Sequence, residues 1–224
     1  MAQRGTRPAI MEVNSTNATW AKRLHSSPMA SRKNGLERKD ALLDAALDCF
    51  ASRGIHATGI EAVRKAAGAS PSSVYHLFGG VNDLVVALLV RTSERWVGHL
   101  TKRVIATKTG EEAIAALVDG HLEWVLAHRK EARFLYQAMA LELAGSERQR
   151  LDAFKRKLKE PLFEHLSGFA KRGELPAWST ATLELVVLGP AHEACRRLLA
   201  GGDVDVAWMR RALPHLAWKA VIET

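Results

Sequence analysis

Residues 70–76 hold small polar and flat side chains whose chemistry suits contact with a nucleic acid. Ser70 followed by Pro71 predicts the start of a helix, because serine caps free amides and proline has no amide to leave unpaired there. In such a helix Val74 and Phe78 share the inner face. The side chains left for the outer face are Ser72, Ser73, Tyr75 and His76. Their hydroxyl, phenol and imidazole groups can hydrogen-bond to base edges and phosphate oxygens.

Two further helices must position this one. Residues 38–53 predict the first, since apolar side chains recur there at three- and four-residue spacing, and Gly54 ends it in a left-handed conformation. The second begins with Thr58-x-x-Glu61, which predicts a capping box, and ends at Gly68. The apolar residues of the two inner faces are Leu43, Ala46, Leu47 and Phe50, and then Ile60, Val63 and Ala67.

Three short helices in this order, with glycine at the inner turn, predict a helix-turn-helix over residues 36–80. Each piece alone is common, and Tyr75 taken alone is more typical of a half-buried packing residue. The combination favours a fold that places its third helix in the major groove of double-stranded DNA.

Residues 38–84 resemble the DNA-binding domain of TetR/AcrR-type transcriptional regulators. The matching residues are Ala45-Ala46-x-x-x-Phe50, Gly54, Thr58, Ile60, Ala66-Ala67-Gly68-Ala69-Ser70, Val74-Tyr75-x-x-Phe78 and Asp83-Leu84. The resemblance implies a homodimeric, ligand-responsive repressor. The predicted DNA-contacting residues are Thr58, Ser70, Ser72, Ser73, Tyr75 and His76, supplemented by the basic residues Arg64 and Lys65.

The sequence departs from the family pattern at two phosphate-facing positions. Gly59 stands where the family often has a second hydroxyl, and Val81 stands where it usually has a lysine. Their loss should weaken the sequence-independent part of DNA binding and flatten its salt dependence. Arg64, Lys65 and the basic N-terminal segment are candidates to compensate.

The formal net charge of +8 suits a polyanionic partner, and it is concentrated near the N-terminus. Residues 1–39 carry eight Lys or Arg against two Glu, so they account for most of it. Residues 1–28 are polar and lack helical periodicity, which leaves two interpretations: a disordered tail, or an arm that touches DNA. We expect a disordered basic extension over residues 1–35, with translation beginning at Met1 or at Met29.

From residue 81 onward the chain predicts only helices, so the fold class is all-α. The N-terminal helix-turn-helix domain would be followed by a C-terminal helical bundle, residues 81–224, for ligand binding and dimerisation. The predicted helices cover residues 81–106, 110–128, 131–145, 146–172 with a kink at Pro161, 179–200 and 201–222.

A bundle of this kind can enclose a ligand pocket, and large flat side chains on its middle helices are the candidates for its wall. They are Trp124, His128, Phe134, Tyr136, Met139, Phe163 and Trp178, although aromatic residues at helical spacing are more often core. His121 and His128 share a helix face and, with His192 and Glu193, could suggest a metal site. No close ligand pair marks one, so we expect neither metal nor cofactor.

The helix over residues 179–200 has an apolar strip that is wider than one core face requires, which favours a homodimer interface. The predicted interface residues are Val187, Ala191, Ala194, Cys195 and Leu198. The alternative is that this is the central helix of a monomeric bundle. A pseudo-palindromic operator favours the dimer, because it needs two recognition helices about 34 Å apart.

Other features narrow the class of protein. Gly-x-Ser-x-Gly, a phosphate loop and Cys-x-x-Cys are all missing, so we do not expect an enzyme. Cys49 and Cys195 are expected to be free, buried thiols. Without an 18-residue apolar run or a signal-peptide segment, the predicted location is the cytoplasm and no membrane partner is expected.

The predicted function is therefore that of a DNA-binding regulator whose operator affinity changes when an unidentified small molecule binds in the bundle. The alternative is a constitutive DNA-binding protein whose C-terminal bundle serves only to dimerise.

Overall fold

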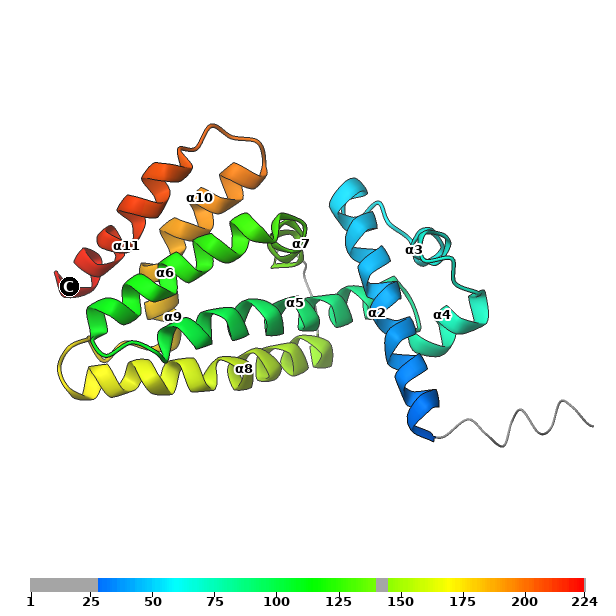
Figure 1. Ribbon diagram of the computed structural model, residues 1–224, viewed down its shortest axis with the longest axis horizontal. Coiled ribbons are helices and arrows are strands. Elements are labelled where there is room, and N and C mark those ends of the chain that lie inside the picture. The colour runs from blue at the N-terminus through cyan, green and yellow to red at the C-terminus, as the bar shows by residue number, and fades with distance from the viewer. Residues whose placement is uncertain (1–27, 140–144, 224) are drawn as a thin grey trace, which may run out of the picture. The chain divides into compact units, whose positions relative to one another are not determined.

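The computed structural model describes residues 28–139 and 145–223, and within these ranges every regular element is a helix (Figure 1). The all-α prediction is confirmed. The elements are α2 (Pro28–Arg53), α3 (Ile60–Ala66), α4 (Pro71–Leu77), α5 (Val81–Val104), α6 (Gly110–Ala127), α7 (Arg129–Met139), α8 (Gly145–Lys171), α9 (Thr180–Leu183), the π-helix η2 (Glu184–Leu188), α10 (Gly189–Leu199) and α11 (Val206–Ile222).

Helix α2 is longer than predicted. It begins at Pro28, so residues 28–35, which the sequence analysis placed in a disordered extension, are helical. Good helix formers such as Ala30, Arg32 and Leu36 extend a helix once the following residues have nucleated it, even with Gly35 in between. The rest of the predicted tail, residues 1–27, lies outside the described residues.

The region 42–88 has the predicted three-helix order. Gly54 (φ +84°) and Gly68 (φ +60°) adopt the left-handed backbone that ends α2 and turns the chain from α3 to α4. Buried side chains from all three helices meet in one apolar core, including Phe50, Val63 and Val74. The predicted inner faces are therefore confirmed.

The predicted capping box at the start of α3 is wrong. Gly59, rather than Thr58, is the N-cap, and no side chain caps this end. The hydroxyl of Thr58 instead donates to the carbonyl of Gly54 at 2.8 Å, and it lies 3.4 Å from the carbonyl of Cys49. The Thr58 hydroxyl thus bonds backbone carbonyls near the C-terminal end of α2 instead of amides at the start of α3.

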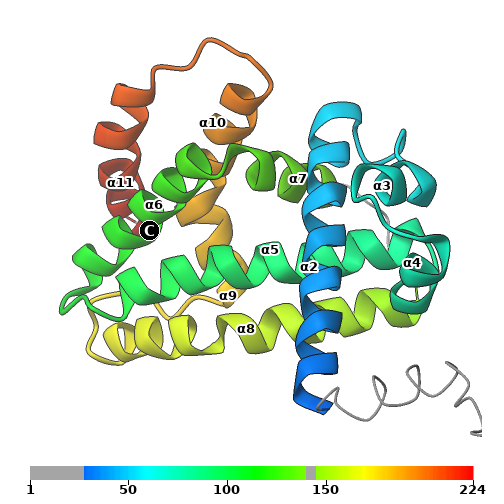
Figure 2. The same cartoon turned by 45° about the vertical axis from the view of Figure 1, so that its right-hand side comes forward.

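Helix α5 packs against α6, α7 and α8 and forms the central element of the bundle (Figure 2). Its buried face includes Leu84, Leu88, Trp96 and Leu100. At its start, the carboxylate of Asp83 accepts a hydrogen bond from the amide of Gly79 at 2.8 Å.

Helix α6 has the capping box that α3 lacks. The amide of Glu112 donates to the Thr109 hydroxyl at 3.2 Å, and the Glu112 carboxylate accepts from the Thr109 amide at 3.3 Å. The amide of Gly110 donates to the carboxylate of Glu174 at 2.7 Å, so the loop after α8 also caps this end. These bonds hold α6 and the end of α8 together.

The single helix predicted over residues 179–200 is divided into α9, η2 and α10. Ser179 caps it as predicted, but residues 184–188 form a π-helical segment. Pro190 has no amide to bond the carbonyl four residues earlier, which explains why the regular pattern is interrupted there. The last helix begins at Val206 with Asp205 as its N-cap, later than the predicted start at residue 201.

Helix α7 contacts the end of α2 through one face. The rings of Phe134 and Phe50 stack with centroids 5.7 Å apart, and both side chains are fully buried. Lys130 pairs with Asp48 at 2.6 Å beside them. Arg91 of α5 pairs with Asp44 at 2.8 Å. Ion pairs between exposed side chains contribute little to the free energy of folding. The stack of the two phenylalanine rings is therefore the main contact between α7 and the end of α2.

No single helix in residues 28–139 and 145–223 is long and apolar enough to cross a membrane. Helices α4 and α5 together have the necessary length and apolar composition, but a bend of 62° separates them.

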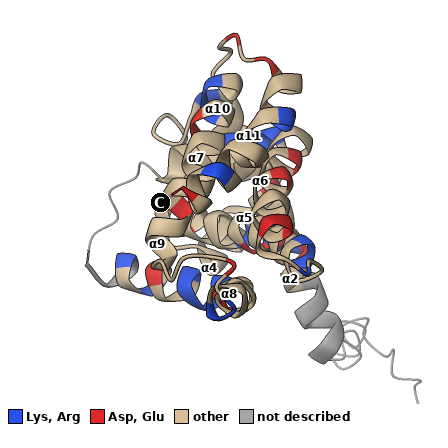
Figure 3. Cartoon of the chain, turned by 90° about the vertical axis from the view of Figure 1, so that its left-hand side faces the viewer, with Lys and Arg blue, Asp and Glu red and all other residues tan. Residues whose placement is uncertain are grey.

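Charged residues are spread over many helices, and Figure 3 shows Lys and Arg on α8, α10 and α11.

We predict that Phe134→Ala lowers the free energy of unfolding by about 3–5 kcal/mol, because it removes a fully buried ring and leaves a cavity against Phe50. Urea unfolding measures this change. Gln137→Ala, an exposed position on the same helix, is the matched control and should change the free energy by less than about 0.5 kcal/mol. Equal effects of the two substitutions would contradict the proposed packing.

Candidate functional site

The exposed face of α4 has the predicted composition. Ser72, Tyr75 and His76 are exposed and Ser73 is half-buried, whereas Val74 and Phe78 are buried. Tyr75 is an apolar ring with a polar tip, and 52% of it is accessible. A short helix with a polar, flat outer face and an apolar inner face can enter a groove and form hydrogen bonds there.

Ser70 has a structural role at the start of α4. Its Oγ accepts a hydrogen bond from the amide of Ser73 at 3.3 Å and lies 3.2 Å from the Ser72 hydroxyl, while Pro71 occupies the first turn. The predicted helix start is therefore confirmed. Ser70 fixes the start of the helix and so fixes where Ser72 and Ser73 lie.

Glu61 links α3 to α4. Its carboxylate accepts a hydrogen bond from Arg64 Nε at 2.8 Å and another from the Tyr75 hydroxyl at 3.4 Å. The hydrogen bond from Arg64 is the main reason that the pKa of Glu61 is lowered. Arg64 also donates to the carbonyl of Ala69 at 3.0 Å, across the turn. Arg64 thus stabilises the geometry of the turn, and Lys65, which is exposed, is the freer of the two cations predicted to contact phosphate.

Thr58 cannot offer its side chain to DNA in this conformation. The residue is only 3% accessible, and its hydroxyl is bonded to backbone carbonyls. We therefore remove Thr58 from the predicted set of contacts. The sequence could not distinguish a hydroxyl that caps the next helix from one that caps the end of the previous helix.

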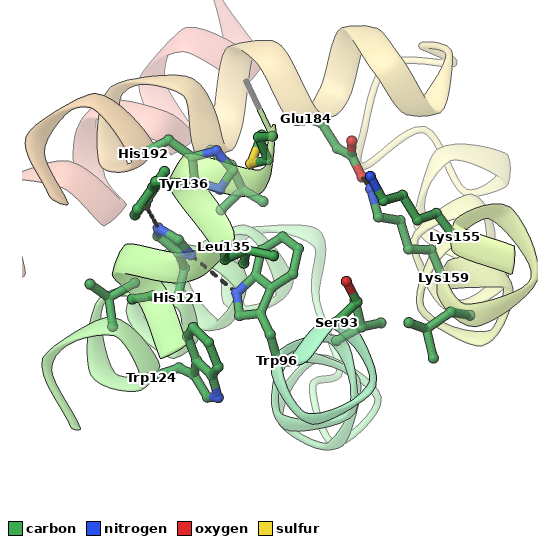
Figure 4. Close-up of a pocket in the computed structure, with 16 residues that line it drawn as sticks. Ser93, Trp96, His121, Trp124, Leu135, Tyr136, Lys155, Lys159, Glu184 and His192 are labelled. Carbon is green, nitrogen blue, oxygen red and sulfur yellow. Dashed lines mark hydrogen bonds and ion pairs between the residues drawn. The ribbon is translucent and has the colours of Figure 1, made fainter. Parts of the chain in front are cut away.

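A cavity of about 100 Å³ lies inside the bundle, between α5, α6, α7, α8, η2 and α10 (Figure 4). Of the seven predicted pocket residues, Trp124, Tyr136 and Met139 line it. The remaining lining residues are Ser93, Trp96, Val97, His121, Val125, Ala132, Leu135, Lys155, Leu158, Lys159, Glu184, Leu188 and His192.

The other four predicted pocket residues lie elsewhere. Phe134 stacks on Phe50 in the core, and His128 stacks on Trp124 with ring centroids 5.4 Å apart. Phe163 and Trp178 line a separate open groove between α8 and residues 175–184. The prediction failed for these residues because helical spacing identifies a buried face but not which helix covers it.

One wall of the cavity is a hydrogen-bonded chain. Trp96 Nε1 donates to His121 Nδ1 at 3.2 Å, and His121 Nε2 lies 3.1 Å from the Tyr136 hydroxyl. Burial lowers the pKa of His121 well below its usual value, so the ring is neutral. Because Nδ1 accepts, Nε2 carries the proton and donates to Tyr136. The tyrosine hydroxyl in turn bonds the thiol of Cys195, whose pKa burial raises to about 12.

His192 lies beside this chain, with its ring centroid 4.4 Å from that of His121. Its Nε2 is buried and has no hydrogen-bond partner among the described residues. Burial, and to a lesser extent the charge of Lys159, lowers the pKa of His192 to about 4. A neutral imidazole nitrogen without a partner is a group that a bound molecule could satisfy.

The opposite side of the cavity is charged. Lys159 of α8 forms an ion pair with Glu184 of η2, and Lys155 lies one turn earlier on α8. Burial is the main cause that lowers the pKa of Lys155. The cavity therefore has an apolar, partly aromatic body, a neutral imidazole side and a cationic side (Figure 4).

The residues considered as metal ligands do not converge. His121 and His192 are adjacent, but His128 stacks on Trp124, and Glu193 hydrogen-bonds to Arg196 and Arg197. Among the described residues, no group of three or more His, Cys, Asp or Glu is arranged to hold a metal ion.

The predicted dimer interface needs correction. Val187, Ala191 and Cys195 are 1%, 1% and 0% accessible, because they pack into the core of the chain itself. Ala194 and Leu198 are half-buried. The exposed apolar side chains of the last elements are instead Leu185, Trp208, Leu216 and Ile222.

Comparison with known proteins places α4 within a recognised family of DNA-binding sequences. Residues 42–88 match the family model described as bacterial regulatory proteins, tetR family. Residues 42–88 are thus similar to the DNA-binding domain of the tetR family. The resemblance drawn from the sequence is thus confirmed, and in this family the first three helices form the helix-turn-helix that the structure shows at α2–α4.

Among curated proteins, the chain is similar to the HTH-type transcriptional activator FasR of Mycolicibacterium smegmatis, with 26% identity over 101 residues. The similarity covers 45% of this chain and 46% of FasR, so the chain spans about half the length of that relative.

Solved structures share the fold over most of the chain. A TetR family transcription regulator from Marinobacter aquaeolei VT8 superposes with a TM-score of 0.73 at 18% identity, covering 85% of this chain and 98% of the other. FadR from Bacillus subtilis, solved in complex with stearoyl-CoA, gives a TM-score of 0.69 at 15% identity, covering 81% and 98%. At these identities the similarity shows a shared fold.

We predict that acid destabilises the protein through His192. Above about pH 6.5 the imidazole is neutral in both the folded and the unfolded chain. Between pH 6.5 and about 4 the His192 imidazole takes up a proton in the unfolded chain but not in the folded chain. The free energy of unfolding therefore decreases as the pH is lowered through this range. The expected loss from this group is about 2–3 kcal/mol between pH 6.5 and 4.5.

Urea unfolding at several pH values measures this loss. His192→Gln should remove that part of the slope, and His215→Gln, at an exposed position, should not. A slope unchanged by His192→Gln would show that the ring is not held neutral.

Proposed function

We propose that the protein is a homodimeric transcriptional regulator that binds an operator through α4 and is released from it by a small molecule. The observation that carries this proposal is the polar exposed face of α4, with Tyr75 and His76 beside Ser72, in a domain of the tetR family. Release from the operator would make it a repressor.

Helix α7 supports a coupling between the cavity and the DNA-binding helices. Leu135 and Tyr136 line the cavity, and Phe134, which directly precedes them in the chain, stacks on Phe50 at the end of α2. A ligand that favours one position of α7 would therefore also favour one position of α2. It can shift the equilibrium only by its difference in affinity for the two states, and 1–3 kcal/mol would change operator affinity about 5- to 150-fold.

The exposed apolar side chains of η2 and α11 support the homodimer. Leu185 is 73% accessible and Ile222 is 57% accessible, and Trp208 and Leu216 are also exposed. We propose this set as the dimer contact in place of the buried strip on α10. Analytical ultracentrifugation of Leu185→Lys tests it: a native dimer that becomes monomeric supports the contact, and a variant that remains dimeric contradicts it.

The comparisons favour a ligand-responsive regulator over the constitutive alternative. FadR of Bacillus subtilis was solved with stearoyl-CoA, and the internal cavity lies in the part of this chain that shares the FadR fold. Selection of bound DNA from a random pool, followed by footprinting of the selected site, tests the regulator function directly. A pool that yields no preferred sequence would contradict it.

We predict that Tyr75→Ala weakens operator binding by about 10-fold or more, because a hydrogen-bonding, stacking side chain leaves the reading face. Gel-shift titration on the selected operator measures it. Ile105→Ala, at a similarly exposed position just after the end of α5, should bind as the native chain does. An unchanged footprint and affinity for Tyr75→Ala would show that α4 is not the reading helix.

We predict that Lys65→Gln weakens binding to all DNA sequences alike and reduces the slope of log affinity against log salt by about 1, since one phosphate contact is lost. Titrations at several salt concentrations measure this slope. A loss confined to the operator sequence would instead indicate a base contact.

A further inference from the structure

The ion pair between Lys159 and Glu184 lies at the boundary between the internal cavity and the open groove on α8. Lys155, Lys159 and Glu184 line both spaces. The cavity holds about 100 Å³ and the groove about 1630 Å³. The ion-paired side chains therefore form part of the boundary between the cavity and the groove.

The boundary has one more positive than negative charge. Glu184 neutralises Lys159, but Lys155 forms no ion pair with any described residue, and its partial burial lowers its pKa. A partly desolvated ammonium without a paired carboxylate attracts an anion. A carboxylate that arrives from the groove can contact Lys155 and compete with Glu184 for Lys159.

The opposite side of the cavity requires a different group. The partnerless Nε2 of His192 is buried in a neutral ring, and the chain Trp96–His121–Tyr136 beside it is already satisfied internally. Among the described residues on this side, His192 is the one whose buried polar atom still lacks a partner. A neutral imidazole nitrogen pairs with a hydroxyl, which can donate or accept as the tautomer requires.

The space between the two sides is small, apolar and bordered by indole rings. Trp96 and Trp124 form part of its wall (Figure 4). A cavity of about 150 Å³ accommodates benzene in a protein core, so about 100 Å³ suits at most one ring, with some widening as Glu184 moves. A chain as long as a stearoyl group has no room there.

We propose that the ligand of this cavity is a single-ring hydroxylated aromatic carboxylate. Its carboxylate would bind Lys155 and Lys159 in place of Glu184, its ring would lie against Trp96 and Trp124, and its hydroxyl would bond His192 Nε2. The inference rests on the proposed role of the cavity as the effector site, and it names the ligand class of that site.

Isothermal titration calorimetry on the full chain without DNA tests this class. The probes are 4-hydroxybenzoate, benzoate, 4-hydroxybenzyl alcohol and stearoyl-CoA. We expect 4-hydroxybenzoate to bind tightest, benzoate about 5- to 10-fold more weakly, and the neutral alcohol at least 10-fold more weakly. Because no DNA is present, failure here is distinguishable from failure of operator binding.

Three variants assign the contacts. Lys155→Met should weaken 4-hydroxybenzoate binding about 10-fold, whereas Arg150→Met, at an exposed position of the same helix that lines neither the cavity nor the groove, should not. His192→Phe should abolish the preference for 4-hydroxybenzoate over benzoate. Glu184→Gln should tighten binding several-fold, because it removes the competing carboxylate from Lys159. Circular dichroism confirms that each variant is folded.

Several results would overturn the proposal. They are tighter binding of stearoyl-CoA than of any probe carboxylate, equal affinities for the alcohol and the acid, no heat from any carboxylate at millimolar concentration, and equal effects of Lys155→Met and Arg150→Met. Weaker binding by Glu184→Gln would likewise contradict displacement of the ion pair.

Discussion

The stacking of Phe134 on Phe50 is the contact on which the rest of this structure depends. Helix α7 is only eleven residues long, so its two faces move together. One face meets the end of α2 through this stack, and the neighbouring residues Leu135 and Tyr136 line the cavity. The cavity and the end of α2 are therefore both in contact with the same short helix.

The cavity inside the bundle is lined by neutral side chains on one side and by charged side chains on the other. His121 accepts from Trp96 and donates to Tyr136, which fixes its tautomer and leaves no site for a second proton. Across the cavity, Lys155 and Lys159 face a single carboxylate, Glu184. This asymmetry gives a bound molecule a defined orientation, because each side can satisfy only one kind of group.

Local patterns predicted the local features correctly. Ser70 and Pro71 act within one turn, so the start of α4 and the outward position of Tyr75 followed from neighbouring residues alone. Thr58 is an exception among these local patterns, because its hydroxyl bonds the carbonyl of Gly54 at the end of α2 rather than an amide at the start of α3. Two other features were not predicted: the start of α2 at Pro28 and the π-helical turn at residues 184–188. Both depend on how far a helix continues and where its hydrogen-bond pattern is interrupted, which residues at a single helix end do not determine.

The sequence by itself determined that the chain is all-helical, that its N-terminal part is a helix-turn-helix, and which side of α4 is polar. These depend on helical periodicity and capping, which act over a few residues. The tertiary structure alone decided what covers each apolar face. Val187 and Cys195 show the same periodicity whether they pack in their own core or against another subunit, because periodicity reports burial and not the partner. For the same reason, only the folded chain could bring His192 and Lys155 to opposite sides of one cavity.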